Sequence, residues 1–372
     1  MSVTVYPASA WPAIAPIWDT LVTAAPNASF FLSRPWTEAW FEVFADQLRP
    51  EILIVESASG VIGACVLVAR TQRYGPVRWR RVHLNTAGED DDDSPCLELN
   101  ALLCRAGTER EVADALWSHL ETQEWDEFVI EAAGEASTLE CIEAAASTAR
   151  EPSQNYTLEK RSRTNYYVRL SEILDFKADY EQRLSRNTRE QVRRSLKLYG
   201  QTGEVVLESA GSVARALEML AELRELHQKA WTTRGRPGVF ASPRFQAFHS
   251  ALIRQAFPQG HIQVLRVATP LQTIGLLYNF VWRGKVCFYQ SGLHYTGDNR
   301  YKPGLVSHAF AIRHAREQGC CEYDFLAGES RYKRSLSTAG RTMVWATWRR
   351  VGRKQQLRAL LKRLKRYSSI AR

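Results

Sequence analysis

The stretch from Gly275 to Lys333 reads GLLYNFVWRGKVCFYQSGLHYTGDNRYKPGLVSHAFAIRHAREQGCCEYDFLAGESRYK and carries the clearest structural signal in the chain. Its first two apolar runs, residues 276–282 and 286–290, have the pattern of strands and are separated by a glycine-containing turn. Apolar residues then recur at helical spacing from Leu305 to Ile312. A short apolar run at residues 323–326 follows. The order hairpin, loop, helix, strand predicts one α/β unit.

The loop before this helix is rich in glycine and carries cations. Pro303 and Gly304 fall at the expected helix start, where proline is tolerated and the first amides lack partners. Arg300 and Lys302 add positive charge beside those amides, and the helix dipole acts in the same direction. The loop therefore suits an anion. A plain connection with two solvated cations fits equally well, because a lone glycine-rich loop is a weak motif.

Several motifs in and before this stretch resemble one family. They are SRNTREQVRRSLK (185–197), LHQKAW (226–231), YQSG (289–292), YKPG (301–304), YDFLAGE (323–329) and YK (332–333). Together they resemble the GNAT-type acyltransferases associated with bacterial cellulose and exopolysaccharide biosynthesis, which are relatives of the Fem-type aminoacyltransferases. The resemblance extends from about Phe31 to Thr347 and identifies a superfamily rather than a substrate. One departure is Leu336, where the family usually has an aromatic residue.

The two halves of the chain show a faint repeat. Residues 60–63 (GVIG) resemble residues 273–275 (TIG), and residues 127–135 (EFVIEAAGE) resemble residues 322–329 (EYDFLAGE) in the same order. The family resemblance implies tandem GNAT-like acyltransferase domains of the α/β (α+β) class, with mixed central sheets flanked by helices. We expect an N-terminal domain at residues 1–160, a catalytic domain at 161–347 and a basic tail helix at 348–372. The first half lacks a YKPG counterpart, so we assign it a structural or acceptor-binding role.

The positive charge of the chain is concentrated at its end. The 372 residues carry a net charge of +9, with 49 basic and 40 acidic residues. Ten basic and no acidic residues lie between Arg349 and Arg372, leaving 39 basic against 40 acidic elsewhere. Leucines at 357, 360, 361 and 364 recur at helical spacing within this segment. This basic amphipathic pattern fits either an anionic membrane surface or docking on the protein itself.

Other features bound the location and the cofactors. The N-terminal residues lack a basic stretch and are interrupted by prolines, so we expect no signal peptide. No apolar run approaches the roughly 20 residues that a membrane span needs. The seven cysteines show neither C-x-x-C nor His/Cys ligand spacing. We therefore predict a cytoplasmic protein without a metal site, with peripheral contact at the inner membrane face as an option.

The resemblance implies a donor site between residues 289–292 and 324–326, with the donor diphosphate at the helix start. The donor would be acetyl-CoA or another acyl-CoA. The residues expected to bind it are Gln290, Ser291, Gly292, Arg300, Tyr301, Lys302, Gly304 and Leu305. Asp324, Glu329 and His227 are candidate proton acceptors, and Lys333 would neutralise a phosphate or the oxyanion. His227 also fits a buried core residue, and Asp324 a turn cap.

The acceptor is expected beside an arginine cluster and several aromatic rings. Arg189 and Arg193 lie on a predicted helix at residues 188–199 that also carries Arg194, and Arg186 lies just before it. This basic cluster suits the phosphates of a nucleotide-linked or lipid-linked acceptor, or of tRNA. A solvated polar face fits the cluster equally. Trp231, Tyr289 and Tyr332 complete the expected acceptor contacts through the resemblance.

These features predict an acyl-CoA-dependent N-acyltransferase acting on an amino sugar or related precursor in polysaccharide or cell-envelope biosynthesis. Direct attack is favoured, because neither a nucleophilic-elbow serine nor a Cys-His pairing is recognisable. One alternative is a Fem-like transferase that draws its amino acid from aminoacyl-tRNA. Another is a non-catalytic, membrane-docked scaffold of an exopolysaccharide machine.

Overall fold

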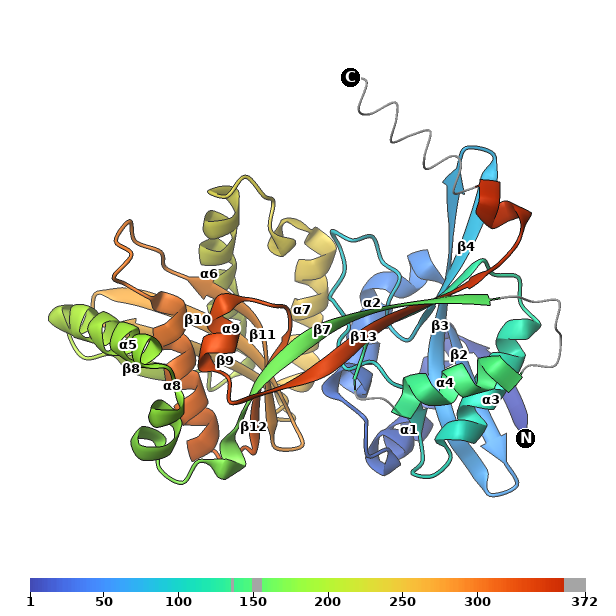
Figure 1. Ribbon diagram of the computed structural model, residues 1–372, viewed down its shortest axis with the longest axis horizontal. Helices are drawn as coiled ribbons and strands as arrows, with labels where there is room; N and C mark the ends of the chain where they lie inside the picture. The colour runs from blue at the N-terminus through green and yellow to red at the C-terminus, as the bar shows by residue number, and fades with distance from the viewer. Residues whose placement is uncertain (135–136, 149–155, 358–372) are drawn as a thin grey trace. The chain divides into compact units, whose positions relative to one another are not determined.

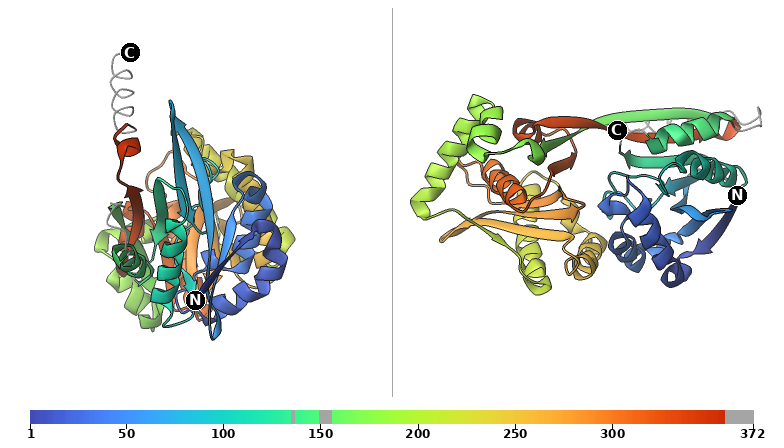
Figure 2. Two further views of the ribbon diagram at one scale, coloured as in Figure 1. Left: turned by 90° about the vertical axis from the view of Figure 1, so that its right-hand side faces the viewer. Right: turned by 90° about the horizontal axis from the view of Figure 1, so that it is seen from below.

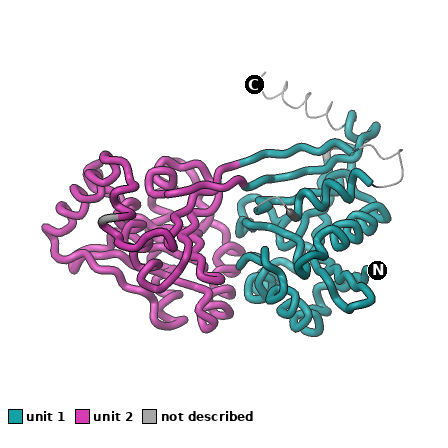
Figure 3. Tube along the Cα trace, turned by 60° about the horizontal axis from the view of Figure 1, so that its bottom comes forward, with its two compact units in different colours: residues 1–162, 343–372 teal, residues 163–342 magenta. Residues whose placement is uncertain are grey.

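The computed structural model describes residues 1–134, 137–148 and 156–357 and divides into two compact units (Figure 3). Unit 1 comprises residues 1–162 with 343–372, and unit 2 comprises residues 163–342. The sequence placed the corresponding boundaries at 160/161 and 347/348. Both structural boundaries fall inside strands, β7 (Tyr156–Arg169) and β13 (Ala339–Arg350). The chain therefore leaves unit 1 along one strand and returns to it along another.

Unit 1 is a mixed sheet with helices on both faces (Figure 1). Its remaining elements are β1 (Ser2–Pro7), α1 (Trp11–Ala24), α2 (Arg34–Leu48), β2 (Glu51–Ser57), β3 (Gly60–Tyr74), β4 (Val77–Leu84), β5 (Leu103–Cys104), α3 (Glu109–Glu121), β6 (Glu127–Ala133) and α4 (Ser137–Thr148). The strand order is β1-β2-β3-β4-β6-β13, with β5 paired to β3. Only β4 and β6 run parallel among these pairs. An apolar core fills the space between this sheet and α3 and α4.

Unit 2 repeats this arrangement. Its elements are the later part of β7, a π-helix (Phe176–Glu181), α5 (Arg186–Tyr199), β8 (Val206–Ser209), α6 (Val213–Thr232), α7 (Pro243–Ala256), β9 (Ile262–Thr269), β10 (Gln272–Trp282), β11 (Lys285–Leu293), α8 (Pro303–Glu317), β12 (Glu322–Ala327) and α9 (Arg331–Leu336). The order is β8-β9-β10-β11-β12-β7, and only β11 and β12 run parallel. Helices α6 and α7 lie on one face of the sheet and α8 on the other (Figure 2).

The tandem α/β fold predicted from the sequence is confirmed. In both units a strand and two helices precede three antiparallel strands, a helix and a strand parallel to the last of the three. The repeated glycine motif lies in β3 of unit 1 and β10 of unit 2. The repeated glutamate motif begins β6 and β12. Equivalent sequence signals therefore occupy equivalent strands.

Serine caps fix the start of four helices. In each, the serine hydroxyl accepts a hydrogen bond from the amide three residues further on, which satisfies one otherwise unpaired donor. The caps and donors are Ser33 with Trp36, Ser185 with Thr188, Ser212 with Arg215 and Ser242 with Phe245. The predicted cap at Ser33 is among them. Three of these caps set the starts of α5, α6 and α7 in unit 2, near the candidate site.

The basic tail begins inside the fold of unit 1. Arg349, at the end of β13, donates to Glu127 Oε1 (2.8 Å) and pairs with Glu159. Lys354 pairs with Asp126 at 2.5 Å. Residues 358–372, which hold most of the predicted tail helix, lie outside the described residues. Within the described ranges, no helix combines the length and the apolarity needed to cross a membrane.

Candidate active site

The pairing between β11 and β12 ends a third of the way along β11. The two strands pair in parallel only over residues 285–287 and 322–324. Against β10, β11 holds one extra residue at Tyr289, because Tyr278 faces Gln290 while Asn279 faces Phe288. Such a bulge bends and twists its strand. The sequence placed the donor in this part of unit 2, between residues 289–292 and 324–326.

A strained residue follows on β12. Leu326 has a left-handed backbone, with φ of 57°, which is costly for a branched side chain unless neighbours hold it. Its amide donates to Asp324 Oδ1 at 2.7 Å, and its carbonyl accepts from Lys333 Nζ at 3.3 Å. Lys333 Nζ also donates to the carbonyl of Ala327 at 2.8 Å. Two of the predicted catalytic residues, Asp324 and Lys333, therefore meet at the turn that directs β12 away from its pairing with β11.

Asp324 is fully buried and extensively hydrogen-bonded. Besides the amide of Leu326, its carboxylate accepts from Asn165 Nδ2 at 3.2 Å and is paired with Arg341. Arg341 also donates to Glu322 at 2.6 Å. Burial raises the pKa of Asp324, and the charge of Arg341 opposes that rise. A carboxylate with three partners has little freedom to take a substrate proton, so the geometry favours a positioning role.

His227 has the surroundings of a neutral proton acceptor. It lies on α6 with 5% exposure, and burial, together with the charge of Arg234, lowers its pKa. Its Nδ1 is 3.3 Å from Gln228 Oε1, and Gln228 Nε2 donates to the carbonyl of Pro237 at 2.6 Å. Because that second bond orients the Gln228 amide, the network assigns the proton to Nδ1 and leaves Nε2 as an acceptor. Gly238, with φ of 70°, permits this packing, since an added Cβ would lie 2.5 Å from Gln228 Oε1.

The remaining predicted catalytic residue, Glu329, is exposed in the loop between β12 and α9. The predicted catalytic set therefore occupies three environments. Asp324 and Lys333 converge on Leu326, His227 packs beside Trp231 with ring centroids 5.7 Å apart, and Glu329 faces solvent.

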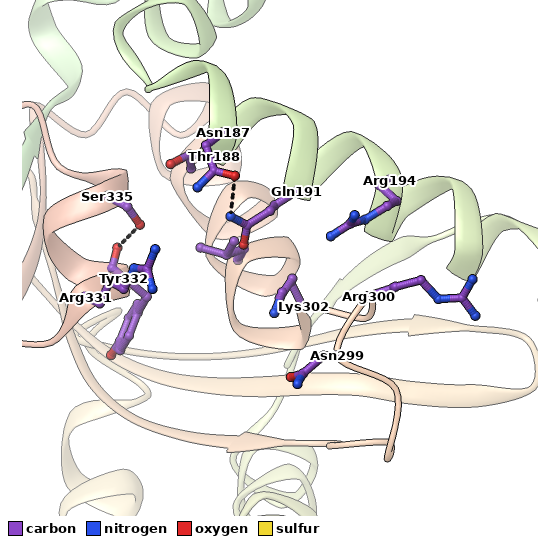
Figure 4. A pocket seen from close by; sticks show the side chains of 11 residues that line it. Asn187, Thr188, Gln191, Arg194, Asn299, Arg300, Lys302, Arg331, Tyr332 and Ser335 are labelled. Carbon is purple, nitrogen blue, oxygen red and sulfur yellow. Dashed lines mark hydrogen bonds between the residues drawn. The ribbon is translucent and has the colours of Figure 1, made fainter.

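A cavity of about 680 Å³, here called the α8 cavity, opens at the start of α8 (Figure 4). Helix α5 contributes Asn187, Thr188, Gln191 and Arg194, the loop and α8 contribute Asn299, Arg300, Lys302 and Leu305, and α9 contributes Arg331, Tyr332 and Ser335. The amide of Lys302 donates to Ser195 Oγ at 2.9 Å, which ties α5 to the helix start. No side chain caps α8.

The α8 cavity is electropositive. Pro303 is the first helical residue, so the amides of Gly304 and Leu305 have no partner within the helix. Among the described residues no carboxylate forms an ion pair with Lys302 or Arg331, whereas Arg300 is paired with Asp298 at 2.6 Å. Helix amides, the helix dipole and two uncompensated cations together form a site suited to a phosphate or diphosphate.

Of the eight residues expected to bind the donor, three line this cavity, three lie in the adjoining sheet, and Tyr301 and Gly304 do neither. Arg300, Lys302 and Leu305 line the cavity. Tyr301 instead packs against Tyr199, with ring centroids 4.9 Å apart. Gln290, Ser291 and Gly292 pair with residues 276–278 of β10.

The three arginines expected to bind acceptor phosphates lie outside the α8 cavity. Arg186 pairs with Glu190, Arg189 Nη1 donates to backbone carbonyls that include Leu184 (2.9 Å), and Arg193 lies 4.0 Å from Glu181. Of the α5 residues that do line the cavity, Arg194 belonged to the predicted basic cluster, whereas Asn187, Thr188 and Gln191 were absent from the sequence prediction. Their signal was indirect. The buried residues of α5 are Thr188, Ser195 and Tyr199, and they mark the side of the helix that faces α8.

The three predicted aromatic contacts also separate. Tyr332 lines the α8 cavity and stacks on His308 with centroids 5.2 Å apart. The hydroxyl of Tyr289 lies 3.0 Å from Nε2 of the buried His249. Trp231 lies within 5.9 Å of the Arg234 guanidinium.

In unit 1 the position equivalent to the end of β11–β12 pairing is filled by the chain itself. Strands β4 and β6 pair over residues 81–83 and 127–129. Beyond them Asn100, 1% exposed, accepts from Asn85 Nδ2 at 2.7 Å and donates to the carbonyls of Ala132 (3.0 Å) and Leu84 (3.2 Å). This segment is a structural reason, besides the missing YKPG counterpart, to look for the donor in unit 2.

Comparison with known proteins connects this geometry to a domain family. Residues 186–334 match the family model described as an acetyltransferase (GNAT) domain. A comparison with curated proteins finds no match.

Solved structures resemble the chain over nearly its whole length. FemX has a TM-score of 0.58 at 10% identity, with 97% of this chain and 99% of FemX covered. A conserved protein from Bacteroides thetaiotaomicron VPI-5482 has a TM-score of 0.54 at 10% identity, covering 90% and 97%. L-PGS from Bacillus licheniformis has a TM-score of 0.51 at 10% identity, covering 89% and 96%. At such identity the likeness shows the fold alone, while the domain match supports an acyltransferase.

Proposed function

We propose that this protein is an acyl-CoA-dependent N-acyltransferase, using acetyl-CoA or another acyl-CoA. We further propose that it acts on an amino sugar or related precursor in polysaccharide or cell-envelope biosynthesis. The observation that carries the donor assignment is the α8 cavity, which places Lys302 and Arg331 around a bare helix start. The acceptor class rests on the motif resemblance described above.

The residues present fit the donor's diphosphate. Gly304 brings no side chain to the helix start and packs closely on Leu293, since a Cβ there would come within 3.2 Å of Leu293 Cδ1. The Gly304 and Leu305 amides would donate to phosphate oxygens, while Lys302 and Arg331 would supply the compensating charge. At the end of β11–β12 pairing, strand-edge amides would polarise the thioester carbonyl.

The proposed reaction is direct acyl transfer. The acceptor's neutral amine attacks the thioester carbonyl carbon, a C–N bond forms, and the C–S bond then breaks. The amine loses one proton, for which His227 Nε2 is the candidate acceptor, and the departing thiolate takes up one proton. A base whose pKa lies below that of an ordinary histidine is neutral near pH 7, as this role requires.

The α8 cavity supplies a direct test, with isothermal titration of CoA as the measurement. Removing one charged phosphate partner costs about 1.5–3 kcal/mol, so Lys302→Ala and Arg331→Ala should each weaken CoA binding at least about tenfold. Arg186→Ala is the matched control, because Arg186 lies on the same helix as Arg194 but pairs with Glu190 outside the cavity. Unchanged CoA affinity in both cavity variants would refute the donor site.

The same experiment separates the alternatives. A Fem-like transferase would bind aminoacyl-tRNA and not CoA, and the affinity for tRNA would fall in the cavity variants. A non-catalytic scaffold would bind neither donor and would release no thiol from acetyl-CoA. We also propose a cytoplasmic location with peripheral contact between residues 349–372 and an anionic membrane, which vesicle co-sedimentation with and without anionic lipid would test.

A further inference from the structure

A second cavity of unit 2, about 310 Å³, lies between the C-terminal end of α6 and the loop that follows β11. We call it the α6 cavity. Lys229, Thr233 and Arg234 contribute from the α6 side, and His294 and Tyr295 from the loop. It shares no lining residue with the α8 cavity. Its volume is at the lower end of the range for small-molecule sites, so it would hold a sugar-sized group rather than a coenzyme.

The charge of the α6 cavity is positive and uncompensated. Lys229 and Arg234 both line it, and no aspartate or glutamate does. In the part of the chain that the structure describes, neither cation forms an ion pair within 4.0 Å of a carboxylate. Two cations facing one concave space, with no acidic partner, favour an anionic occupant.

Aromatic rings hold one of these cations in place. The Arg234 guanidinium carbon lies 5.9 Å from the Trp231 ring and 5.4 Å from the Tyr295 ring. These contacts bridge the two walls of the cavity and leave the guanidinium edges available for hydrogen bonds. A planar guanidinium restrained in this way suits two oxygens of a phosphate. Tyr295 is 52% exposed, which leaves part of its ring free to pack against an attached sugar.

The α6 cavity lies close to the candidate base. Arg234 is near enough to His227 for its charge to lower the pKa of that histidine. Trp231, one helical turn after His227, contacts both residues. A group bound beside Arg234 would therefore carry the rest of its molecule toward the imidazole.

We propose that the α6 cavity binds a phosphate group of the acceptor, with Arg234 and Lys229 as its cationic partners and Tyr295 as the wall for the attached sugar. This inference rests on the proposed function, and it narrows the acceptor to a phosphate-bearing amino sugar, whether free or nucleotide-linked. It also separates the tasks of the two cavities. The α8 cavity recognises the donor, and the α6 cavity recognises the acceptor.

The test is calorimetric titration of the full-length protein, first with CoA and then, at saturating CoA, with acceptor probes. The probes are glucosamine, glucosamine 1-phosphate, glucosamine 6-phosphate and glucuronate. At least one phosphorylated probe should bind at least about tenfold more tightly than glucosamine. Glucuronate tests whether a carboxylate suffices, and binding as tight as that of the phosphorylated sugars would overturn the phosphate assignment.

Variants locate the effect. Arg234→Ala and Lys229→Ala should each reduce the preference for the phosphorylated sugar by about tenfold or more while leaving CoA affinity unchanged. Arg236→Ala is the matched control, because Arg236 is an exposed arginine of the same turn that does not line the cavity.

The outcomes separate this inference from the proposed function. CoA binding with no preference for either phosphorylated probe would overturn the α6 assignment alone. If CoA does not bind, the donor assignment fails. Titration of the acceptor probes without CoA would then still measure binding at the α6 cavity. If the phosphorylated sugar binds only without CoA, it occupies the α8 cavity and the inference is wrong.

Discussion

Replacing Asp324 with asparagine distinguishes a base from a positioning residue. The carboxylate is fully buried between Arg341, Asn165 and the amide of Leu326. Removing one member of a buried ion pair costs about 3–5 kcal/mol. Arg341 keeps Glu322 as a partner at 2.6 Å, so we expect the lower value, about 3 kcal/mol. For a unit of this size that corresponds to a melting temperature lower by about 6–12 °C.

Calorimetry and thiol release from acetyl-CoA, measured on the same samples, provide the assay. We expect Asp324→Asn to melt early and to lose activity in step with its stability. Glu329→Gln is the control, because Glu329 is exposed and its loss should leave the melting temperature unchanged. If Asp324→Asn melts like the wild type but turns over at least a hundredfold more slowly, the carboxylate is the base and the positioning role is refuted.

Further substitutions test the packing and the electrostatics of unit 2. An alanine Cβ at Gly292 would lie 2.4 Å from the backbone oxygen of Leu223, so Gly292→Ala should cost about 3 kcal/mol in urea denaturation. Gly275→Ala should cost less, because its Cβ would meet side-chain atoms, among them Ser307 Oγ, and Ser307→Ala should reduce that cost. Equal costs for the two glycine substitutions would contradict this reasoning. Burial lowers the pKa of His308 to about 3 from its usual 6.5, so protons favour the unfolded chain below pH 6.5. The free energy of unfolding should therefore fall by about 1 kcal/mol as the pH decreases from 7 to 5.5. His308→Gln should remove that loss, and an unaltered pH dependence in the variant would refute this explanation.

The sequence predicted the elements around the α8 cavity because their signals are local. The YKPG turn contains both the helix-starting proline and the glycine that follows it, and the apolar runs before it define a hairpin. Strand β13 was not predicted. One of its two pairing partners, β6, lies more than 200 residues earlier, and the last residues of β13 merge with the basic tail.

Residue roles were harder to predict than elements. The motif placed Asp324 near the chemistry, but its bond with Arg341 depends on a strand that begins after the motif ends. On α5, arginines occur on several sides of the helix, so charge alone did not indicate which residues face the cavity. That orientation is set by the buried Thr188 and Ser195 and by the bond from Ser195 to the start of α8.

The return of the chain along β13 has a consequence during synthesis. Glu127 of β6 is fully buried and pairs with Arg81 of the same half and with Arg349, which leaves the ribosome 222 residues later. At about 5–20 residues per second this interval is roughly 10–45 s. The strands from β7 to β12 are all synthesised by Ala327, so they can pair before residues 344–349 of β13 reach β6. Meanwhile the nascent β6 remains an open edge on which chaperones, or other nascent chains, can act.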